Sequence, residues 1–379
     1  MNVLIAGDFA PRARLAQQIE KRNFGDIFSE KLRNIIKSAD CSFVNFESPI
    51  VENGYNPIQK CGPNLRCTKE AAEAVKYAGF TGVTMANNHI LDYGTEGLNN
   101  SVDCCKSQGL DIVGVGNNLK EAEKVLYLSK GNKVLAVINC CEHEFSIATD
   151  KEAGANPLNP IRQFYLIQEA KKQADYVLVI VHGGHEHYQL PSPRMQETYR
   201  FFIDAGADAV VNHHQHCYSG YEIYKEKPIF YGLGNFCFDI MPTKDNTTWN
   251  YGYMVELSFG ITVNYKLYPY NQYGRKATIE LLDIGSFDKE LKSLNNSIVD
   301  NKILKQKIID YYLKCRTNEL SILEPYFGRI LGKLYSLGIL PDFIKGKKAA
   351  CVLNHIDCES HRDKLLFALK KKYKIICRQ

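Results

Sequence analysis

Several short apolar segments in the first 240 residues run directly into polar side chains of the types that bind metals. The last of them, residues 209–211, is followed by His213, His214 and His216. In an α/β protein, a strand that carries imidazoles to its C-terminal end brings them to the edge of the sheet where sites collect. Clustered imidazoles repel one another when protonated, and they usually share a cation. The histidine cluster therefore predicts a metal site that other strands must complete.

Four earlier apolar segments end in carboxylate, amide or imidazole side chains. They are residues 3–6, followed by Asp8; 41–46, followed by Glu47; 82–86, followed by Asn88 and His89; and 175–181, followed by His182. Because parallel strands bring their carboxyl ends to one edge of a sheet, we expect these side chains to lie together. Carboxylate oxygens and imidazole nitrogens suit Mn, Fe or Zn, and a carboxylate that bridges two cations is the two-metal arrangement of phosphoryl chemistry.

Helical segments alternate with these strands, which predicts a layered α/β fold. After Asp239 the pattern changes to antiparallel strands at 253–259, 261–270 and 276–282. Residues 287–340 have a helical pattern, 349–354 are expected to form a strand, and 360–372 a basic amphipathic helix. We therefore expect one domain at 1–285 and a mainly helical extension at 286–379.

Composition excludes some classes of function and location. The net charge of +5 over 379 residues is too diffuse to predict nucleic-acid binding. The N-terminus resembles a strand and has no basic region typical of a signal peptide. No segment approaches the ~20 apolar residues of a membrane helix, and the thirteen cysteines form no regular disulfide framework. We expect a cytoplasmic protein with reduced thiols and no integral membrane segment.

The ordered motifs resemble the CapA family of bacterial capsule and poly-γ-glutamate synthesis proteins, a branch of the calcineurin-like metallophosphoesterase superfamily. The resemblance covers about residues 1–270. The motifs that carry it are Gly7-Asp8, Asn45-Phe-Glu47, Asn87-Asn88-His89 with Asp92-x-Gly94-x-x-Gly97, His182-x-Gly184-x-Glu186, His213-His214-x-His216 and Leu233-Gly-Asn235-Phe236-x-Phe238-Asp239. The resemblance implies a four-layer α/β/β/α sandwich with a dinuclear metal centre, to which the predicted C-terminal helical extension is added.

Carried over by position, the family resemblance implies a role for each ligand. Asp8 and His216 would hold the first metal, Glu47 would bridge, and the second metal would be held by Asn88, His182 and His214. His89 would face the substrate and protonate or stabilise the leaving oxygen. Glu186 is assigned only to a supporting role or to substrate contact. One or two Mn, Fe or Zn ions are expected.

The sequence departs from the superfamily pattern at two positions. Where the superfamily has Asp-x-His, this chain has Asp8-Phe9-Ala10, which removes one ligand of the first metal. Asn212 stands where a glycine usually precedes the histidine pair.

The expected function is that of a CapA-like protein of capsule, poly-γ-glutamate or surface-polysaccharide biosynthesis with a metal-dependent hydrolase site for phosphoesters. One alternative is a metal-dependent amide hydrolase or transferase acting on poly-γ-glutamate, in which Arg12 and Arg14 recognise carboxylates. Another is a non-catalytic assembly component of a capsule machine. The expected partners are an anionic small-molecule or polymer substrate and other capsule-synthesis proteins.

Overall fold

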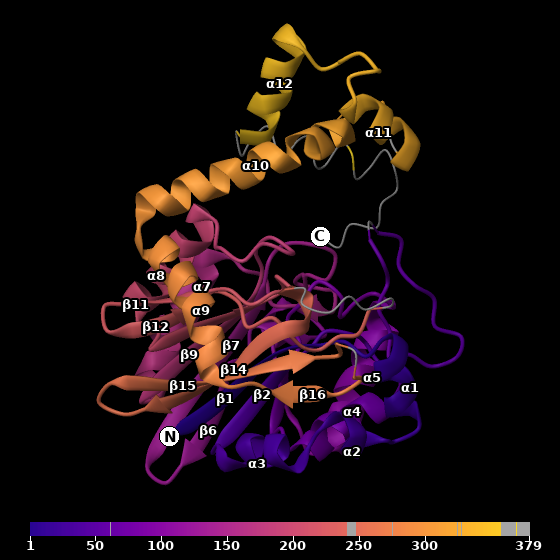
Figure 1. Ribbon diagram of the computed structural model, residues 1–379. Helices are drawn as coiled ribbons and strands as arrows, with labels where there is room; N and C mark the ends of the chain where they lie inside the picture. Colours follow the sequence, from indigo (N-terminus) through magenta and orange to yellow (C-terminus); the bar gives the residue numbers. More distant parts are fainter. Residues whose placement is uncertain are drawn as a thin grey trace. The chain divides into compact units, whose positions relative to one another are not determined.

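The structure, a computed structural model, describes residues 1–60, 62–240, 248–274, 276–323, 325–326 and 328–357, together with Leu369. The chain divides into two compact units, Met1–Asn301 and Lys302–Arg378. The first unit is built on two large β-sheets (Figure 1). It extends beyond the expected domain boundary at 285 and includes the helix α9 (Ile284–Val299).

The larger sheet has eight strands in the order β16-β15-β14-β1-β2-β3-β4, with β13 paired to the end of β1. Strands β1 to β4 are parallel, whereas β14 to β16 run antiparallel and extend the sheet beyond β1. The strands are β1 (Asn2–Phe9), β2 (Cys41–Phe46), β3 (Gly82–Thr84), β4 (Asp111–Val113), β13 (Asn235–Cys237), β14 (Tyr251–Phe259), β15 (Val263–Gln272) and β16 (Ile279–Leu281).

The second sheet has six strands in the order β11-β12-β10-β9-β7-β6, and its central strands β7, β9, β10 and β12 are parallel. Its strands are β6 (Leu126–Lys130), β7 (Lys133–Cys141), β9 (Tyr176–His182), β10 (Ala209–His213), β11 (Tyr221–Tyr224) and β12 (Lys227–Phe230). A small pair, β5 (Val115–Gly116) and β8 (Gly154–Ala155), lies outside both sheets.

Strand β1 shows how the layers pack, because successive side chains of a strand point to opposite faces. Val3 and Ile5 face the second sheet, where they are buried with residues of β7 and β9. Leu4 and Ala6 face the helices on the other side of the larger sheet. These helices are α1 (Ala13–Glu20), α2 (Phe24–Ile27), α3 (Glu30–Ser38), α4 (Glu70–Ala78) and α5 (Gly94–Ser107).

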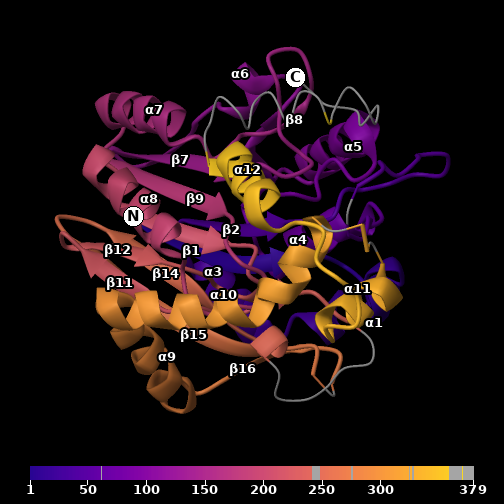
Figure 2. The same cartoon turned by 90° about the horizontal axis from the view of Figure 1, so that it is seen from above.

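Helices α7 (Pro160–Gln173) and α8 (Pro193–Ala205) cover the outer face of the second sheet, beside β7 and β9 in the view of Figure 2. Each begins with a capping side chain followed by proline: Asn159 and Ser192 accept hydrogen bonds from the first backbone N–H groups. The short α6 (Leu119–Ala122) lies near β5. The four-layer α/β/β/α arrangement predicted from the sequence is thus confirmed.

The second unit contains α10 (Asn301–Leu323, which starts at the unit boundary), α11 (Arg329–Ser336) and α12 (Gly346–Asp357). The strand predicted at 349–354 is wrong, because this segment lies inside α12; so short an apolar run does not distinguish a strand from a helix. The helix predicted at 360–372 lies outside the described residues except for Leu369. Among the described helices, none combines the length and the apolar character that crossing a bilayer demands.

Candidate metal centre

The candidate centre is built at the carboxyl ends of strands from both sheets. In the larger sheet, Asp8 of β1 pairs with Asn45 of β2, and Glu47 follows β2 directly. In the second sheet, His182 of β9 pairs with His213 of β10. These registers place the ends of neighbouring strands level, so that the polar residues following each apolar run meet between the two sheets.

Three side chains form the first group: Asp8, Glu47 and His216, whose candidate ligand atoms all lie within 4.8 Å of one another. Nε2 of His216 lies 3.7 Å from Oε1 of Glu47, and its Nδ1 lies 3.5 Å from Oδ2 of Asp8. These distances are too long for hydrogen bonds. The distance between Nε2 of His216 and Glu47 suits two ligands of a shared cation, because two atoms each about 2.0–2.2 Å from one metal lie roughly 3–4 Å apart.

Glu47 gives the strongest indication that a cation belongs here. Its side chain is fully buried, and neither carboxylate oxygen has a hydrogen-bond partner among the described residues. A buried carboxylate without a partner is costly unless it is paired or coordinates a metal. The residues present therefore fit the metal ion that the sequence motifs imply.

A second group overlaps the first through Glu47. Nε2 of His182 lies 3.9 Å from Oε1 of Glu47, 3.0 Å from Oδ1 of Asn88 and 3.0 Å from Nδ1 of His214. The structure thus brings together all six residues predicted as ligands, and Oε1 of Glu47 lies within 4 Å of a nitrogen atom in each group. This is the placement expected of a bridging carboxylate.

The electrostatics of the metal-free centre are unfavourable. Burial and the neighbouring charge of Asp8 raise the pKa of Glu47 well above its ordinary value. Burial and the nearby His214 lower the pKa of His182. Burial opposes protonation of His216, but the carboxylates of Glu47 and Asp8 outweigh it and raise the pKa of His216 to about 9. A bound cation would replace that proton and neutralise the two carboxylates.

His89, the predicted acid, lies at the edge of both groups, with Nε2 4.0 Å from Oε1 of Glu47. Its Nδ1 lies 2.6 Å from Oδ2 of Asp92. Lys60 forms an ion pair with Oδ1 of Asp92, and its ammonium is 3.1 Å from Nδ1 of His89. When Nδ1 donates to Asp92, Nε2 faces the centre. The sequence did not indicate a role for Lys60, because a single lysine in a polar loop does not reveal which side chains it contacts.

Asparagines orient the ligands. Nδ2 of Asn45 donates to Oδ1 of Asp8 at 2.7 Å and lies 3.1 Å from Nδ1 of His182. Nδ1 of His216 donates a hydrogen bond to Oδ1 of Asn235, at 3.0 Å, while Nδ2 of Asn235 donates to the carbonyl of His216. Nε2 of His216 is thereby left to face Glu47. Both asparagines belong to the sequence motifs, but the sequence did not indicate what they bind.

The backbone at the histidine cluster adopts a left-handed conformation that non-glycine residues rarely take. The φ angle is 90° at His214 and 53° at His216. The N–H of His214 donates to Oδ2 of Asp8, at 3.2 Å. Unusual backbone of this kind concentrates at functional sites, where the surrounding contacts hold it in place.

The two departures from the superfamily pattern have structural explanations. Ala10 is buried in a small apolar cluster with Leu65 and Phe238, so no ligand side chain stands at that position. Asn212 accepts a hydrogen bond from the hydroxyl of Tyr199 and donates to the carbonyls of Gly183 and Tyr231. It therefore joins the ends of the strands of the second sheet.

Two other predicted residues lie apart from the ligand groups. Glu186 is exposed, with its carboxylate 3.9 Å from Nε2 of the neighbouring His187, and its charge contributes to the raised pKa of Glu47. Its role in substrate contact stays a prediction.

Arg14 forms two hydrogen bonds to the carboxylate of Asp239, at 2.8 and 2.9 Å. Its guanidinium also donates hydrogen bonds to the carbonyl oxygens of Tyr273 and Gly274. Arg14 therefore has a structural role.

Comparisons with known proteins identify the family to which the chain belongs. Residues 2–240 match the family described as bacterial capsule synthesis protein PGA_cap. The chain is 33% identical over 247 residues to capsule biosynthesis protein CapA of Bacillus anthracis, with 63% of this chain and 60% of that protein covered. It is 34% identical over 231 residues to PGA biosynthesis protein CapA of Bacillus subtilis (strain 168), with 60% of each covered. The chain thus spans about 60% of the length of these relatives.

Among solved structures, a putative 5'-nucleotidase from Staphylococcus aureus, in complex with alpha-ketoglutarate, aligns with a TM-score of 0.46 and 15% identity. That alignment covers 77% of this chain and 58% of the nucleotidase chain.

Proposed function

Because the chain belongs to the PGA_cap family of bacterial capsule synthesis proteins, we propose that it is a metal-dependent hydrolase acting on a phosphoester bond during capsule or poly-γ-glutamate synthesis. The family resemblance drawn from the motifs is confirmed by this match. The observation that carries the proposal is the buried Glu47 carboxylate, which has no hydrogen-bond partner among the described residues and lies within 4 Å of a nitrogen atom in each group of ligands.

The proposal includes two divalent cations of the Mn, Fe or Zn type. Asp8, Glu47 and His216 would hold one, and Glu47, Asn88, His182 and His214 would hold the other. Imidazole and carboxylate ligands together favour these metals over Mg²⁺ or Ca²⁺, which prefer oxygen ligands alone. When bound, such cations polarise a phosphoryl oxygen and lower the pKa of a water.

The chain's own residues would orient the substrate and move a proton. Asp92 holds the His89 ring through Nδ1, so that Nε2 faces the centre. A proton at Nε2 of His89 would pass to the leaving oxygen. Lys60 and the backbone N–H of Leu65 both contact the Asp92 carboxylate, and they keep this pair in place while the leaving group departs.

A second candidate function is metal-dependent cleavage or transfer at an amide bond. The relatives take their names from capsule and PGA synthesis, and poly-γ-glutamate is joined by amide bonds. A cation polarises a carbonyl as readily as a phosphoryl group. Release of glutamate oligomers from poly-γ-glutamate, without turnover of phosphoesters, would favour this function over the first.

The test combines elemental analysis of the purified protein with assays on chromogenic phosphate monoesters and diesters. We expect about two equivalents of Mn, Fe or Zn and metal-dependent turnover. His214→Ala should lose both, whereas His143→Ala, at an exposed loop histidine, should keep both. Normal turnover in the His214 variant would refute the proposal. Protein without bound metal and without turnover would support a non-catalytic role in capsule assembly.

A further inference from the structure

The loop that follows β7, residues 142–147, reaches a predicted metal ligand that belongs to the other sheet. Within this loop, the carboxylate of Glu144 accepts a hydrogen bond from Nδ2 of Asn88, at 2.8 Å. Asn88 follows β3 of the larger sheet, whereas the loop continues from β7 of the second sheet. The sequence motifs do not include Glu144, and none of the six predicted ligands lies in this loop.

The amide of Asn88 can serve as a metal ligand only when its oxygen faces the centre. Oδ1 lies 3.0 Å from Nε2 of His182, on the side of the second ligand group. An amide can turn over in place, which exchanges its oxygen for its NH₂ group within the same space. The NH₂ group carries two donors and offers no lone pair to a cation. The orientation of this side chain therefore decides whether the second group contains an amide oxygen.

The Glu144 carboxylate selects one orientation of the amide. An ionised carboxylate accepts hydrogen bonds and donates none, so Asn88 must present Nδ2 to it. This leaves Oδ1 on the other side of the amide, toward His182. With the amide turned over, its oxygen would face the carboxylate oxygen, and two acceptors would repel each other. A hydrogen bond to a charged group is roughly twice as strong as a neutral one, which adds to this preference.

The loop is anchored on both sides of Glu144. On one side, the N–H of Glu142 donates to the carbonyl of His182, at 3.0 Å, and continues the pairing of β7 with β9. On the other side, the hydroxyl of the buried Ser146 accepts a hydrogen bond from the N–H of Leu91, at 3.3 Å. Leu91 lies three residues beyond the amide ligand, so the loop is tied to the segment that carries this ligand.

Other predicted ligands of the centre are oriented in a similar way. Asn235 accepts a hydrogen bond from Nδ1 of His216, and Asn45 donates one to Asp8. Partners of this kind hold a ligand in its coordinating geometry, and their loss typically lowers metal affinity by about 10–100-fold. Glu144 differs from both asparagines because its side chain is exposed, so it can be replaced without opening a buried cavity.

We propose that Glu144 is a positioning residue for the second metal ion, and that it holds Nδ2 of Asn88 so that Oδ1 stays available as a ligand. This inference rests on the two-metal centre of the proposed function, but it concerns metal binding and not turnover. It requires no contact of Glu144 with the metal or the substrate.

The test measures Zn²⁺ binding to metal-free, full-length protein by isothermal titration calorimetry. We expect the wild type to bind two equivalents, and Glu144→Ala to weaken one of them by about tenfold or more while the other is unchanged. Glu144→Gln should stay close to the wild type, because its side-chain oxygen can still accept from Asn88. Co²⁺ adds a spectroscopic readout, since its visible absorption depends on ligand number and geometry; only the alanine variant should alter this spectrum.

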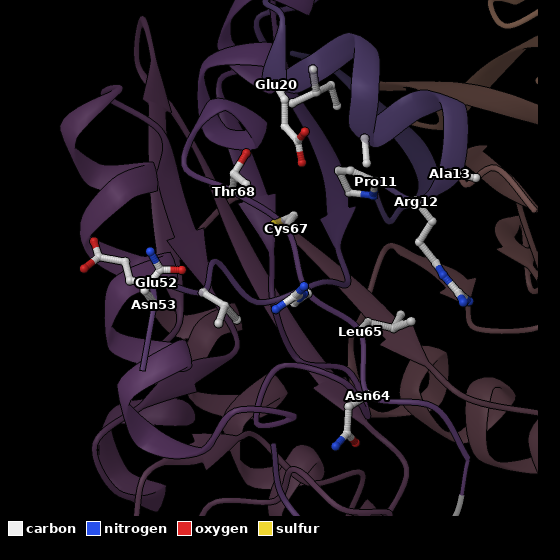
Figure 3. Close-up of a pocket in the computed structure, with 14 residues that line it drawn as sticks. Pro11, Arg12, Ala13, Glu20, Glu52, Asn53, Asn64, Leu65, Cys67 and Thr68 are labelled. Atoms are coloured by element: carbon white, nitrogen blue, oxygen red, sulfur yellow. The ribbon is translucent and has the colours of Figure 1, made fainter. Parts of the chain in front are cut away.

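Glu52→Ala is the matched control. Glu52 is an exposed glutamate in the lining of a separate cavity of about 440 Å³, which also includes the start of α1 (Figure 3). None of the six predicted ligands lines this cavity, so the variant should bind both equivalents like the wild type. In chelator, the thermal melts of Glu144→Ala, Glu52→Ala and the wild type should be similar, because both side chains are exposed.

Unchanged affinity for both equivalents in Glu144→Ala would overturn the positioning role. Equal weakening in the alanine and glutamine variants would also overturn it, because the charge and not the orientation of the amide would then matter. Weakening of both equivalents, with a lower melting temperature in chelator, would indicate a general structural role instead. Weakening of one equivalent in a protein without turnover would retain the positioning role and remove the hydrolase function, whereas turnover with unchanged binding would do the reverse.

Discussion

The backbone N–H of His214 donates a hydrogen bond to Oδ2 of Asp8, at 3.2 Å, and so links the ends of strands that belong to different sheets. The imidazole of His213 makes a second link, because its Nε2 lies 2.9 Å from the carbonyl oxygen of Ala6 in β1. The candidate metal centre can therefore form only when the two sheets are packed together.

Replacing Glu47 by Gln should leave the metal-free protein folded and remove its stabilisation by metal. Glutamine keeps the shape of the side chain but cannot supply the deprotonated carboxylate that a metal ligand requires. In the wild type, Mn²⁺ at about a hundred times its Kd should add roughly 2.7 kcal/mol. Thermal melts with chelator and with Mn²⁺ measure both effects. Glu169→Gln, at an exposed glutamate, is the control, and a Glu47 variant that is still stabilised by Mn²⁺ would contradict the ligand assignment.

Metal binding should change the fluorescence of Trp249, the single tryptophan of the chain. Its ring centroid lies 5.0 Å from that of His216. Because the carboxylates of Glu47 and Asp8 raise the pKa of His216 to about 9, we expect the imidazole to carry a proton at neutral pH without metal and a cation to displace that proton. Titration with Zn²⁺ should therefore give a saturable change in emission that is absent in His216→Ala. An equal response in both proteins would place the cation elsewhere.

Replacing Lys60 by Met should destabilise the protein by about 3 kcal/mol, because it leaves the buried Asp92 carboxylate without its cation. The side chain of Lys60 is only 1% exposed and that of Asp92 is fully buried. The matched control is Lys133→Met, since Lys133 pairs with Asp175 at the surface, where solvent screens the ion pair and it contributes little. Denaturant unfolding of both variants provides the comparison; equal losses would mean that the Lys60 pair is no stronger than a surface pair.

Glu142 should contribute stability that is lost in acid. Burial alone would raise the pKa of this carboxyl, but the N–H of Gly184, at 3.0 Å, and the guanidinium of Arg194 outweigh it and hold the pKa below its ordinary value. A depressed pKa in the folded state contributes stability above the unfolded pKa, about 4.3. Glu142→Gln should thus be less stable than the wild type at pH 7, and the difference should shrink below about pH 4. A constant difference in melting temperature across this range would contradict the assignment.

Replacing Gly7 by Ala should be severely destabilising. A Cβ atom at this position would lie 1.8 Å from the carbonyl oxygen of Gly234, a backbone atom that cannot move aside. We expect a loss of more than about 3 kcal/mol, or failure to fold. Gly25→Ala is the control: its Cβ would meet no atom closer than 3.5 Å, and alanine in helix α2 should be neutral or slightly stabilising. Similar melting temperatures for the two variants would contradict this account.

Sequence reasoning selected the candidate ligands because each lies at the end of an apolar strand, where residue type and position carry information. The residues that it missed act through contacts distant in sequence. Lys60 reaches Asp92 from a loop, and Glu144 accepts a hydrogen bond from the amide of Asn88. Arg14, which the sequence suggested for substrate recognition, is instead bound to Asp239.

The amino-acid sequence by itself determined which residue types stand at the ends of which strands, and hence the layered α/β fold and the nature of the ligands. Only the tertiary structure decided that Glu47 lies within 4 Å of a nitrogen atom in each group of ligands, because β2 and the strands that carry the histidines belong to different sheets. Those sheets are held together by buried apolar side chains such as Ile5 and Val137. Apolar burial is non-directional, so no local pattern in the sequence reports the few ångströms that separate Glu47 from His182 and His216.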